Sequence, residues 1–335
     1  MRSEKWEVGS GKWEVGSEKW EVNWRFTASC FERMKKMKKM IPLKRIAVFL
    51  LLVVMISVPP SAKGDEMLSP YGLKGYAYTY SPRPVDGFHI QTGAMYSLFH
   101  KGNLFHDENL NCRDGYIWVA PLSFTYGDGD WWEVSAATHW ESWENTDFDA
   151  GESGLGDLFL GGKALLLSQE KGMPLDLALM PYVLIPTGNR DKWIGDLTLY
   201  NTTDENDLFY GVNLLLGRQW RQFYLAGNAG FNYAETDIEH IEAETFFFGI
   251  TLEYQIDESF NTYLEFVNTE NKNQNDYPAA HRCHDENTGK DMRELGLGLV
   301  WVKGGWGLKF HLGGGFTATS PDIRVLTLIN RSFSF

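Results

Sequence analysis

The sequence predicts an all-β protein: a transmembrane, up-and-down antiparallel β-barrel of about twelve strands, preceded by a signal peptide. Three observations lead to this prediction. Apolar and polar residues alternate in segments that recur about every 20 residues after residue 65. Short and long polar connections alternate between these segments. A basic stretch and a short apolar run stand before all of them.

Residues 34–64 have the features of a secretory signal peptide. A lysine-rich stretch begins at Met34, and the apolar run Ile46–Val58 follows it. That run is too short to cross a bilayer as a helix, which needs about 20 residues. Small residues up to Gly64 offer a cleavage site, so the mature chain is expected to begin at Asp65. The alternative is an uncleaved amphipathic anchor.

Residues 1–33 contain a seven-residue repeat whose three copies place a tryptophan at Trp6, Trp13 and Trp20. Three copies are too few and too polar for a solenoid or a coiled coil. Because they precede a complete export signal, we interpret them as a non-native or wrongly assigned N-terminal extension.

The charge of the chain is unevenly distributed. Of its 31 Lys/Arg and 44 Asp/Glu residues, 13 and 6 lie in residues 1–64, so residues 65–335 hold 18 and 38 and carry a net charge of −20. So acidic a chain is a poor ligand for nucleic-acid phosphates, and no nucleic-acid partner is expected. Phosphate loops and dinucleotide fingerprints are missing from the sequence, so no cofactor is expected either.

About twelve segments alternate with period two, and each has the nine to eleven residues that a tilted membrane strand needs. Their centres lie near residues 93, 121, 136, 161, 180, 212, 228, 249, 264, 298, 311 and 328. In each segment one row is apolar, such as Phe246, Phe248, Ile250 and Leu252. The other row is mostly Gly, Ser, Asn, His, Asp and Glu, which favours a wet lumen over the surface of a soluble barrel or sandwich.

Connections between the segments indicate two different rims. Tight turns are predicted at 127–130, 169–172, 217–219, 257–259 and 303–305, and longer loops at 101–114, 144–154, 187–206, 234–243 and 270–292. The apolar rows also carry aromatic residues near segment ends, as membrane-interface girdles do. These aromatic residues are Tyr116, Tyr126, Trp132, Trp140, Tyr254, Trp301 and Trp306.

The barrel is predicted to span residues 86–335. Residues 65–85 are predicted to be a periplasmic N-terminal segment, in which 71–80 forms a short extra strand or threads the lumen. Because no plug-like globular segment precedes the barrel, passive diffusion is the expected mode of transport. The terminal Phe335, with apolar residues at alternate positions before it, resembles the sorting signal that the barrel-assembly machinery reads, although Arg331 departs from that pattern.

Two motifs resemble an outer-membrane β-barrel channel family known as "MetA-pathway of phenol degradation". The first runs from Gly154 through Gly156-Asp157 to Lys163, and the second is an apolar strand that closes on Pro186-Thr187-Gly188. The resemblance implies a twelve-stranded barrel in the bacterial outer membrane, in contact with outer-membrane lipid and lipopolysaccharide. It also implies facilitated diffusion of small solutes that are often hydrophobic or aromatic. Phe159, Tyr182 and Phe247 are expected to offer such solutes apolar contacts.

Charged residues on the inward rows are candidates for selectivity. Asp157 and Lys163 share the inward face of one segment, and Asp176 follows across a turn. Such groups can form a structural ion pair, or they can polarise a narrow pore. Further acids and bases are predicted to face the lumen, where opposite rows can set up a transverse field or remain solvated. They are Glu133, His139, Glu141, Glu253, Glu265 and Glu294, and Lys309, His311 and Arg324.

Two loop cysteines, Cys112 and Cys283, are expected to form a disulfide in an oxidising compartment. Cys283 also stands between His281 and His284, but the regular ligand spacing of a zinc site is missing, so no metal site is predicted.

Two further functions compete with a channel. A structural or adhesion barrel would act through its acidic loops. A lipid-modifying enzyme would need a set such as His139 with Glu141 and Ser142, but Ser142 is predicted to face the opposite way. We therefore expect a channel and no enzyme activity.

Overall fold

The structure is a computed structural model that describes residues 67–102, 113–147, 150–189, 192, 194–195, 208–234, 244–270, 291–317 and 320–333. The chain divides into two units, Met1–Ser57 and Val58–Phe335, and every described residue belongs to the second. The predicted extension 1–33, the signal peptide 34–64, the Cys112–Cys283 disulfide and the terminal Phe335 lie outside the described residues.

The described chain is almost entirely β-structure. The strands are β1 (Asp86–Gly102), β2 (Arg113–Asp128), β3 (Trp132–Asn145), β4 (Ala150–Leu155), β5 (Leu158–Leu167), β6 (Asp176–Ile185), β7 (Phe209–Trp220), β8 (Phe223–Ala234), β9 (Glu244–Gln255), β10 (Phe260–Thr269), β11 (Met292–Lys303), β12 (Trp306–Gly315) and β13 (Ile323–Phe333). A short 3₁₀ helix, Gln169–Lys171, lies between β5 and β6. No helix in the described part of the chain is long and apolar enough to cross a membrane.

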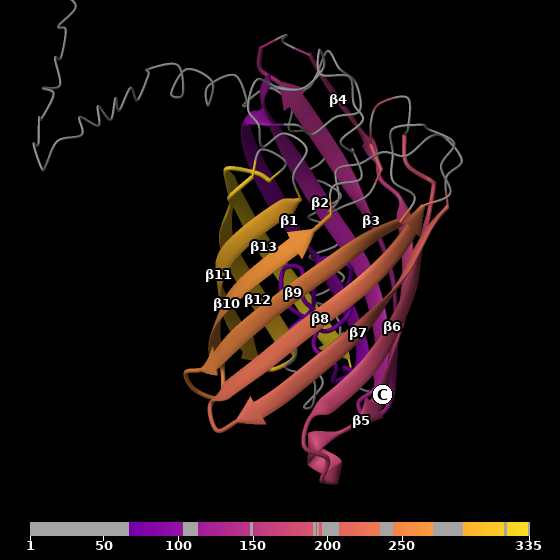
Figure 1. Cartoon of the computed structure of the whole chain (residues 1–335), viewed down its shortest axis with the longest axis vertical. Helices are drawn as coiled ribbons and strands as arrows, with labels where there is room; N and C mark the ends of the chain where they lie inside the picture. The colour runs from indigo at the N-terminus through magenta and orange to yellow at the C-terminus, as the bar shows by residue number, and fades with distance from the viewer. Residues whose placement is uncertain are drawn as a thin grey trace, which may run out of the picture. The chain divides into compact units, whose positions relative to one another are not determined.

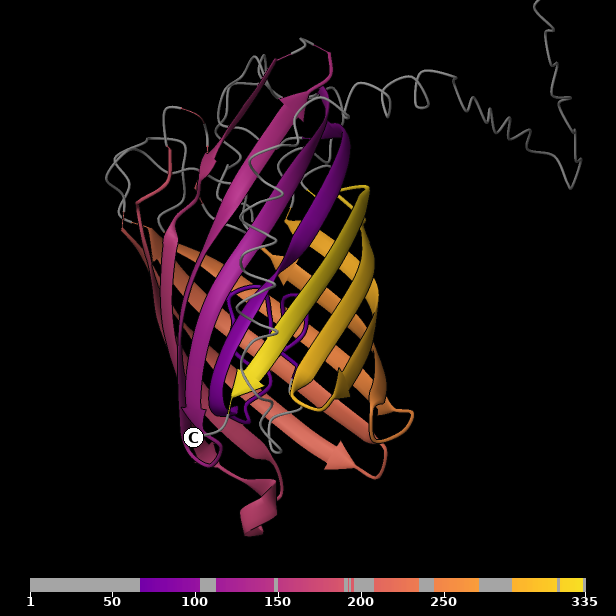
Figure 2. The ribbon, with the colours of Figure 1, turned by 180° about the vertical axis from the view of Figure 1, so that it is seen from behind.

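The strands close into a twelve-stranded barrel, in which β4 and β5 together count as one strand (Figures 1 and 2). Neighbours pair antiparallel in chain order, and β1 closes the cylinder by pairing with both β2 and β13. β4 and β5 pair with successive parts of β3, so they form one strand of the barrel whose pairing is interrupted at Gly156 and Asp157. Within the described residues each strand except β4 pairs on both sides, as hydrocarbon requires, and β4 at the end of the barrel pairs with β3 alone. The predicted fold class and all twelve predicted strand positions are confirmed.

Two predicted connections differ from the structure. The turn predicted at 217–219 lies at Arg221 and Gln222 instead, because Trp220 pairs with Phe223 and prolongs the hairpin. The predicted loop 144–154 is largely strand, because β4 continues the pairing of β3 as far as Leu155. The strand ends that the short connections join, such as the end of β7 and the start of β8, share one rim, called here the turn rim, and the opposite strand ends share the other, called the loop rim (Figure 1).

The outer surface of the barrel is apolar. Phe246, Leu312 and Leu297 are exposed by 56%, 50% and 59%, and aromatic side chains such as Trp132 and Trp140 lie outward towards the two rims. Away from the two rims, the opposite row of the strands is buried or half-buried. An apolar belt edged by aromatics is the surface that a bilayer requires, so this is a transmembrane barrel.

The lumen is occupied by the chain itself. Residues Met67–Val85, the luminal segment, lie inside the barrel, as the indigo trace shows (Figure 1), and most of their side chains are buried. Their expected place as a periplasmic segment is therefore corrected, and of the two forms expected for 71–80 the structure has the one within the lumen. Four buried tyrosines of this short segment, Tyr71, Tyr76, Tyr78 and Tyr80, take up much of the space.

We expect the replacement Leu297→Arg to lower the free energy of unfolding by about 2–4 kcal/mol, because it places a charge near the middle of the apolar belt. The matched control is Leu166→Arg, also on the outward row but near the turn-rim end of β5, with an expected loss of about 0–1 kcal/mol. Urea titration of protein folded in lipid vesicles measures both values. Equal losses at the two positions would contradict the transmembrane placement.

Candidate functional site

The luminal segment is a compact double turn. Leu68 forms a bridge with Lys74, and Gly75 forms one with Tyr80. Gly72 lies at the first turn with φ of +87°, and a Cβ there would come within 2.5 Å of the Ser135 hydroxyl. Only glycine satisfies both the left-handed backbone and the close approach to the wall. The segment is therefore shaped to lie against the barrel wall.

Glu265 of β10 binds three consecutive backbone groups of the luminal segment. Its carboxylate accepts hydrogen bonds from the N–H groups of Ala77 (3.2 Å), Tyr78 (3.0 Å) and Thr79 (2.6 Å). The Thr79 hydroxyl donates to the same carboxylate. Hydrogen bonds to an ionised acceptor are roughly twice as strong as neutral ones, so this contact is a principal anchor of the segment.

Lys309 of β12 makes the complementary contact with backbone acceptors. Its ammonium group donates to the carbonyl oxygens of Leu68, Gly75 (2.8 Å) and Tyr76 (3.0 Å). The lysine is 3% exposed. All three N–H donors of the ammonium group are therefore used at a place that water hardly reaches. The contact holds the carbonyl of Leu68 close to those of Gly75 and Tyr76.

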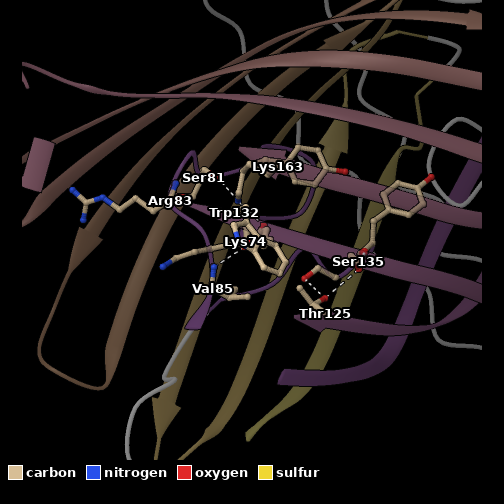
Figure 3. A network of polar contacts seen from close by, with 12 residues as sticks. Lys74, Ser81, Arg83, Val85, Thr125, Trp132, Ser135 and Lys163 are labelled. Atoms are coloured by element: carbon tan, nitrogen blue, oxygen red, sulfur yellow. Dashed lines mark hydrogen bonds and ion pairs between the residues drawn. The ribbon is translucent and has the colours of Figure 1, made fainter. Parts of the chain in front are cut away.

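Glu133 of β3 and Lys163 of β5 hold the segment from the opposite wall. Their charged groups are 2.6 Å apart. Glu133 accepts from the N–H groups of Lys74 (2.9 Å) and Val85 (2.6 Å), and Lys163 donates to the carbonyl of Ser81 at 2.6 Å (Figure 3). One ion pair of the wall therefore binds both the first turn and the end of the segment.

Hydroxyl groups of the wall complete these contacts. Ser135 donates to the Tyr71 carbonyl at 2.7 Å, and Thr125 donates to the Gly72 carbonyl at 2.8 Å (Figure 3). At the turn rim, the Arg83 guanidinium lies 2.8 Å from the Asp176 carboxylate. Asp176 also accepts from the backbone N–H of Gln169, so the last part of the segment is tied to the start of β6.

Two tyrosines of the segment reach acidic residues of the wall. Tyr76 donates to Glu253 at 2.7 Å and Tyr78 to Glu294 at 2.9 Å. Burial first, and the adjacent carboxylates in addition, raise the pKa of both phenols well above the usual value, so the hydroxyls stay protonated and act as donors. Glu294 also receives two hydrogen bonds from Arg324, at 2.8 and 3.0 Å.

The two motifs behind the family resemblance meet at the break between β4 and β5. The Asp157 carboxylate accepts from the N–H of Gly188 at 3.0 Å, and the Asp157 N–H donates to the carbonyl of Gly195 at 3.0 Å. The Gly156 N–H donates to the carbonyl of His139. Asp157 therefore holds the chain after β6 against the wall, and Ile194 in that chain is completely buried.

Above the luminal segment lies a small cavity with aromatic walls, called here the aromatic cavity. Tyr71, Phe159, Tyr182, Phe209 and Phe247 line it, together with Asn213 and Asn232. The rings of Tyr71 and Phe159 are stacked with centroids 4.4 Å apart. The cavity holds about 50 Å³ of space, whereas a cavity that admits benzene measures about 150 Å³. A single aromatic ring needs side chains to move before it can enter.

All of the predicted selectivity residues lie on the inward face. The buried ones are Asp157, Lys163, Asp176, Glu133, His139, Glu141, Glu265, Glu294, Lys309, His311 and Arg324, and Glu253 is half-buried. Several of the bases contact acids, since His311 lies 3.9 Å from Glu265 and His139 lies 3.5 Å from Glu141.

The ion pair suggested for Asp157 with Lys163 is not formed. Asp157 comes just before β5 and lies six positions before Lys163, which amounts to about 20 Å along an extended chain. Lys163 instead pairs across the strands with Glu133. Ser142 faces the outside, opposite to His139 and Glu141, as predicted. Within the described ranges, no group of three or more His, Cys, Asp or Glu side chains is arranged to hold a metal ion.

Sequence reasoning missed the binding partner of the luminal charges. Glu265 and Lys309 bind backbone groups, and backbone groups carry no signal in a sequence pattern. A weaker signal was present: Tyr71, Tyr76, Tyr78 and Tyr80 with Gly72 and Gly75 make this stretch too aromatic for an exposed linker.

Comparison with solved structures agrees with the fold. The barrel is similar to the COG4313 outer membrane channel from Pseudomonas putida F1, with a TM-score of 0.54 and 13% identity over 78% of this chain and 100% of that chain. The KdgM porin (TM-score 0.43, 7% identity, 73% and 99% of the two chains) and the P. putida toluene transporter TodX (0.41, 9%, 75% and 91%) also match. We base the fold assignment on the first alone. No family model and no curated protein sequence matches this chain, so the family name suggested by the motifs is not confirmed.

We expect Lys309→Met to speed hydrogen–deuterium exchange of the amides of Ala77, Tyr78 and Thr79. The methionine fills the space but leaves three buried carbonyls without a donor, and a loss of 1.4 kcal/mol corresponds to about tenfold faster exchange. Mass spectrometry of peptides from 67–85 measures the rate.

The matched control is Lys303→Met, at the exposed turn-rim end of β11, which leaves the rate unchanged. Exchange as slow in Lys309→Met as in the parent protein would mean that Lys309 does not hold the luminal segment.

Proposed function

We propose that this protein is an outer-membrane channel for facilitated diffusion of small solutes, with hydrophobic or aromatic solutes as its preferred class. The observation that carries the proposal is the aromatic cavity inside a closed transmembrane barrel. Stacked rings beside two asparagines suit a small ring with few polar groups, which enters when these side chains move apart. The membrane is the bacterial outer membrane, where closed antiparallel barrels of this kind reside.

The luminal segment gives this channel a closed state. It occupies the turn-rim half of the lumen, where the wall residues Glu133, Lys163, Glu265 and Lys309 bind it. A solute passes when the segment shifts or leaves and water replaces these contacts. Selectivity then falls to the same charged side chains, which line the path once the segment has moved.

The family suggested by the sequence motifs is part of this proposal. Its support is the meeting of Gly156 and Asp157 with Thr187 and Gly188, because motif residues far apart in sequence become neighbours. The aromatic residues Phe159, Tyr182 and Phe247 come together in one cavity, which supports the substrate class. Outer-membrane lipid, lipopolysaccharide and recognition of Phe335 by the barrel-assembly machinery complete the proposed partners.

We expect the double variant Glu265→Gln/Lys309→Met to conduct at least about tenfold more ions than the parent protein in planar lipid bilayers. Each lost charged hydrogen bond favours displacement of the luminal segment by about 1.5–3 kcal/mol. Swelling of proteoliposomes in benzoate and in arabinose then compares aromatic with sugar solutes, and benzoate is expected to enter faster.

The control is the exposed pair Gln255→Leu/Lys303→Met, which has the parent conductance. A double variant that neither conducts nor swells in any solute would contradict the channel function.

A further inference from the structure

Three buried asparagines gather on the inner face of β7 and β8. Asn228 and Asn232 of β8 flank Gly230, each two positions away from it. Asn213 of β7 pairs with the same glycine across the two strands. All three asparagine side chains are buried, so their amides form one cluster on the lumen side of the wall.

Two of these asparagines bind other parts of the protein. Asn228 accepts a hydrogen bond from the backbone N–H of Tyr80 and donates one to the carbonyl of the same residue at 2.9 Å, so it holds the luminal segment. Asn232 accepts a hydrogen bond from the hydroxyl of Tyr182. The roles of both amides are therefore structural.

Asn213 differs from its two neighbours. Its side chain is 4% exposed, and its side-chain oxygen has no hydrogen-bond partner in the part of the chain that the structure describes. A buried acceptor without a donor costs free energy, and such groups are rare in proteins. Gly230 leaves the room for this amide, since a Cβ at that position would overlap with the Asn213 oxygen. A glycine thus keeps space for a polar group to which no described residue donates.

The unpaired amide belongs to the lining of the aromatic cavity. The rings of Phe159 and Tyr182 in this lining are stacked with centroids 5.7 Å apart, and the ring of Phe209 lies 6.1 Å from that of Tyr182. Aromatic faces hold an apolar ring by contact, but they do not distinguish between substituents on its edge. The oxygen of Asn213 supplies that distinction, because it pairs only with a hydrogen-bond donor.

The donor that suits this site is uncharged. No acidic side chain is among the described residues that line the cavity. One amide oxygen does not compensate an ammonium group for the loss of its hydration. The chemistry of the cavity therefore fits a ring that carries a neutral O–H or N–H group.

We propose that Asn213 determines which solutes the aromatic cavity binds, by accepting a hydrogen bond from a neutral O–H or N–H group on an aromatic ring. The inference rests on the proposed channel function, and it names the aromatic solutes that the channel prefers. A site with a buried acceptor discriminates against a solute of the same shape that lacks the donor, because the acceptor then stays unpaired.

The test compares aniline with toluene, which have nearly the same shape and differ in the N–H donors. Protein purified from membranes in detergent is titrated with each solute by calorimetry at neutral pH, where aniline is uncharged, and the heat of titration into empty micelles is subtracted. We expect aniline to bind about fivefold more tightly than toluene. Asn213→Leu fills the same space without an acceptor, and we expect it to weaken aniline binding by about fivefold.

Three controls make the result specific. Toluene binds to Asn213→Leu at least as tightly as to the parent protein, which shows that the cavity is still formed. Asn261→Leu makes the same replacement on the inward row of β10, outside the cavity lining, and keeps the preference for aniline. Pyridine has an acceptor but no donor, and it binds no more tightly than toluene.

The proposal is overturned if the parent protein binds aniline no more tightly than toluene, if Asn213→Leu keeps the preference, or if neither solute binds. Conductance and swelling separate this inference from the channel function. If Glu265→Gln/Lys309→Met conducts but aniline is not preferred, the role of Asn213 is removed and the channel remains. The absence of conductance and of swelling removes the channel as well.

Discussion

The hydrocarbon around the barrel is the constraint on which the rest of the structure depends. It forces each strand inside the membrane to pair with two neighbours, and it sends the charged side chains that lie away from the two rims to the inside. A twelve-stranded lumen is too narrow to keep so many charges fully hydrated. Glu265, Lys309, Glu133 and Lys163 instead bind the backbone of the luminal segment. The segment and the charges therefore satisfy one another.

A polar lumen does not by itself indicate a water-filled pore. Small polar residues on inward rows are typical of water-filled pores, but the same residues can also bind a piece of chain. Ser135 and Thr125 donate to carbonyls of the luminal segment where a pore would place water. Such bonds can be exchanged for bonds to water at modest net cost, because a hydrogen bond within a protein contributes only about 0.5–1.5 kcal/mol over its hydrated alternative. Polar contacts of this kind are therefore compatible with the opening that the proposed channel function requires.

The functional features are concentrated on one side of the barrel. The break at Gly156 and Asp157 immediately precedes β5, and Lys163 of β5 binds the luminal segment. Phe159 of the same strand stacks on Tyr71 of the segment and approaches Tyr182 of β6. The two motifs that give the chain its family resemblance therefore lie beside the luminal segment and the aromatic cavity.

The sequence by itself determined the strands, their order and the face on which each side chain lies. A period of two assigns every strand residue to lipid or lumen, and it therefore assigns Asp157, Glu294 and Arg324 to the inside without reference to their neighbours in space. The tertiary structure alone decided the partners. Glu133 and Lys163 meet because β3 and β5 pair in one particular register, and Glu265 binds backbone N–H groups that lie far away in the chain. Alternation determines whether each side chain points to lipid or to the lumen. It does not determine the register between strands, and it does not show that the luminal segment fills the barrel.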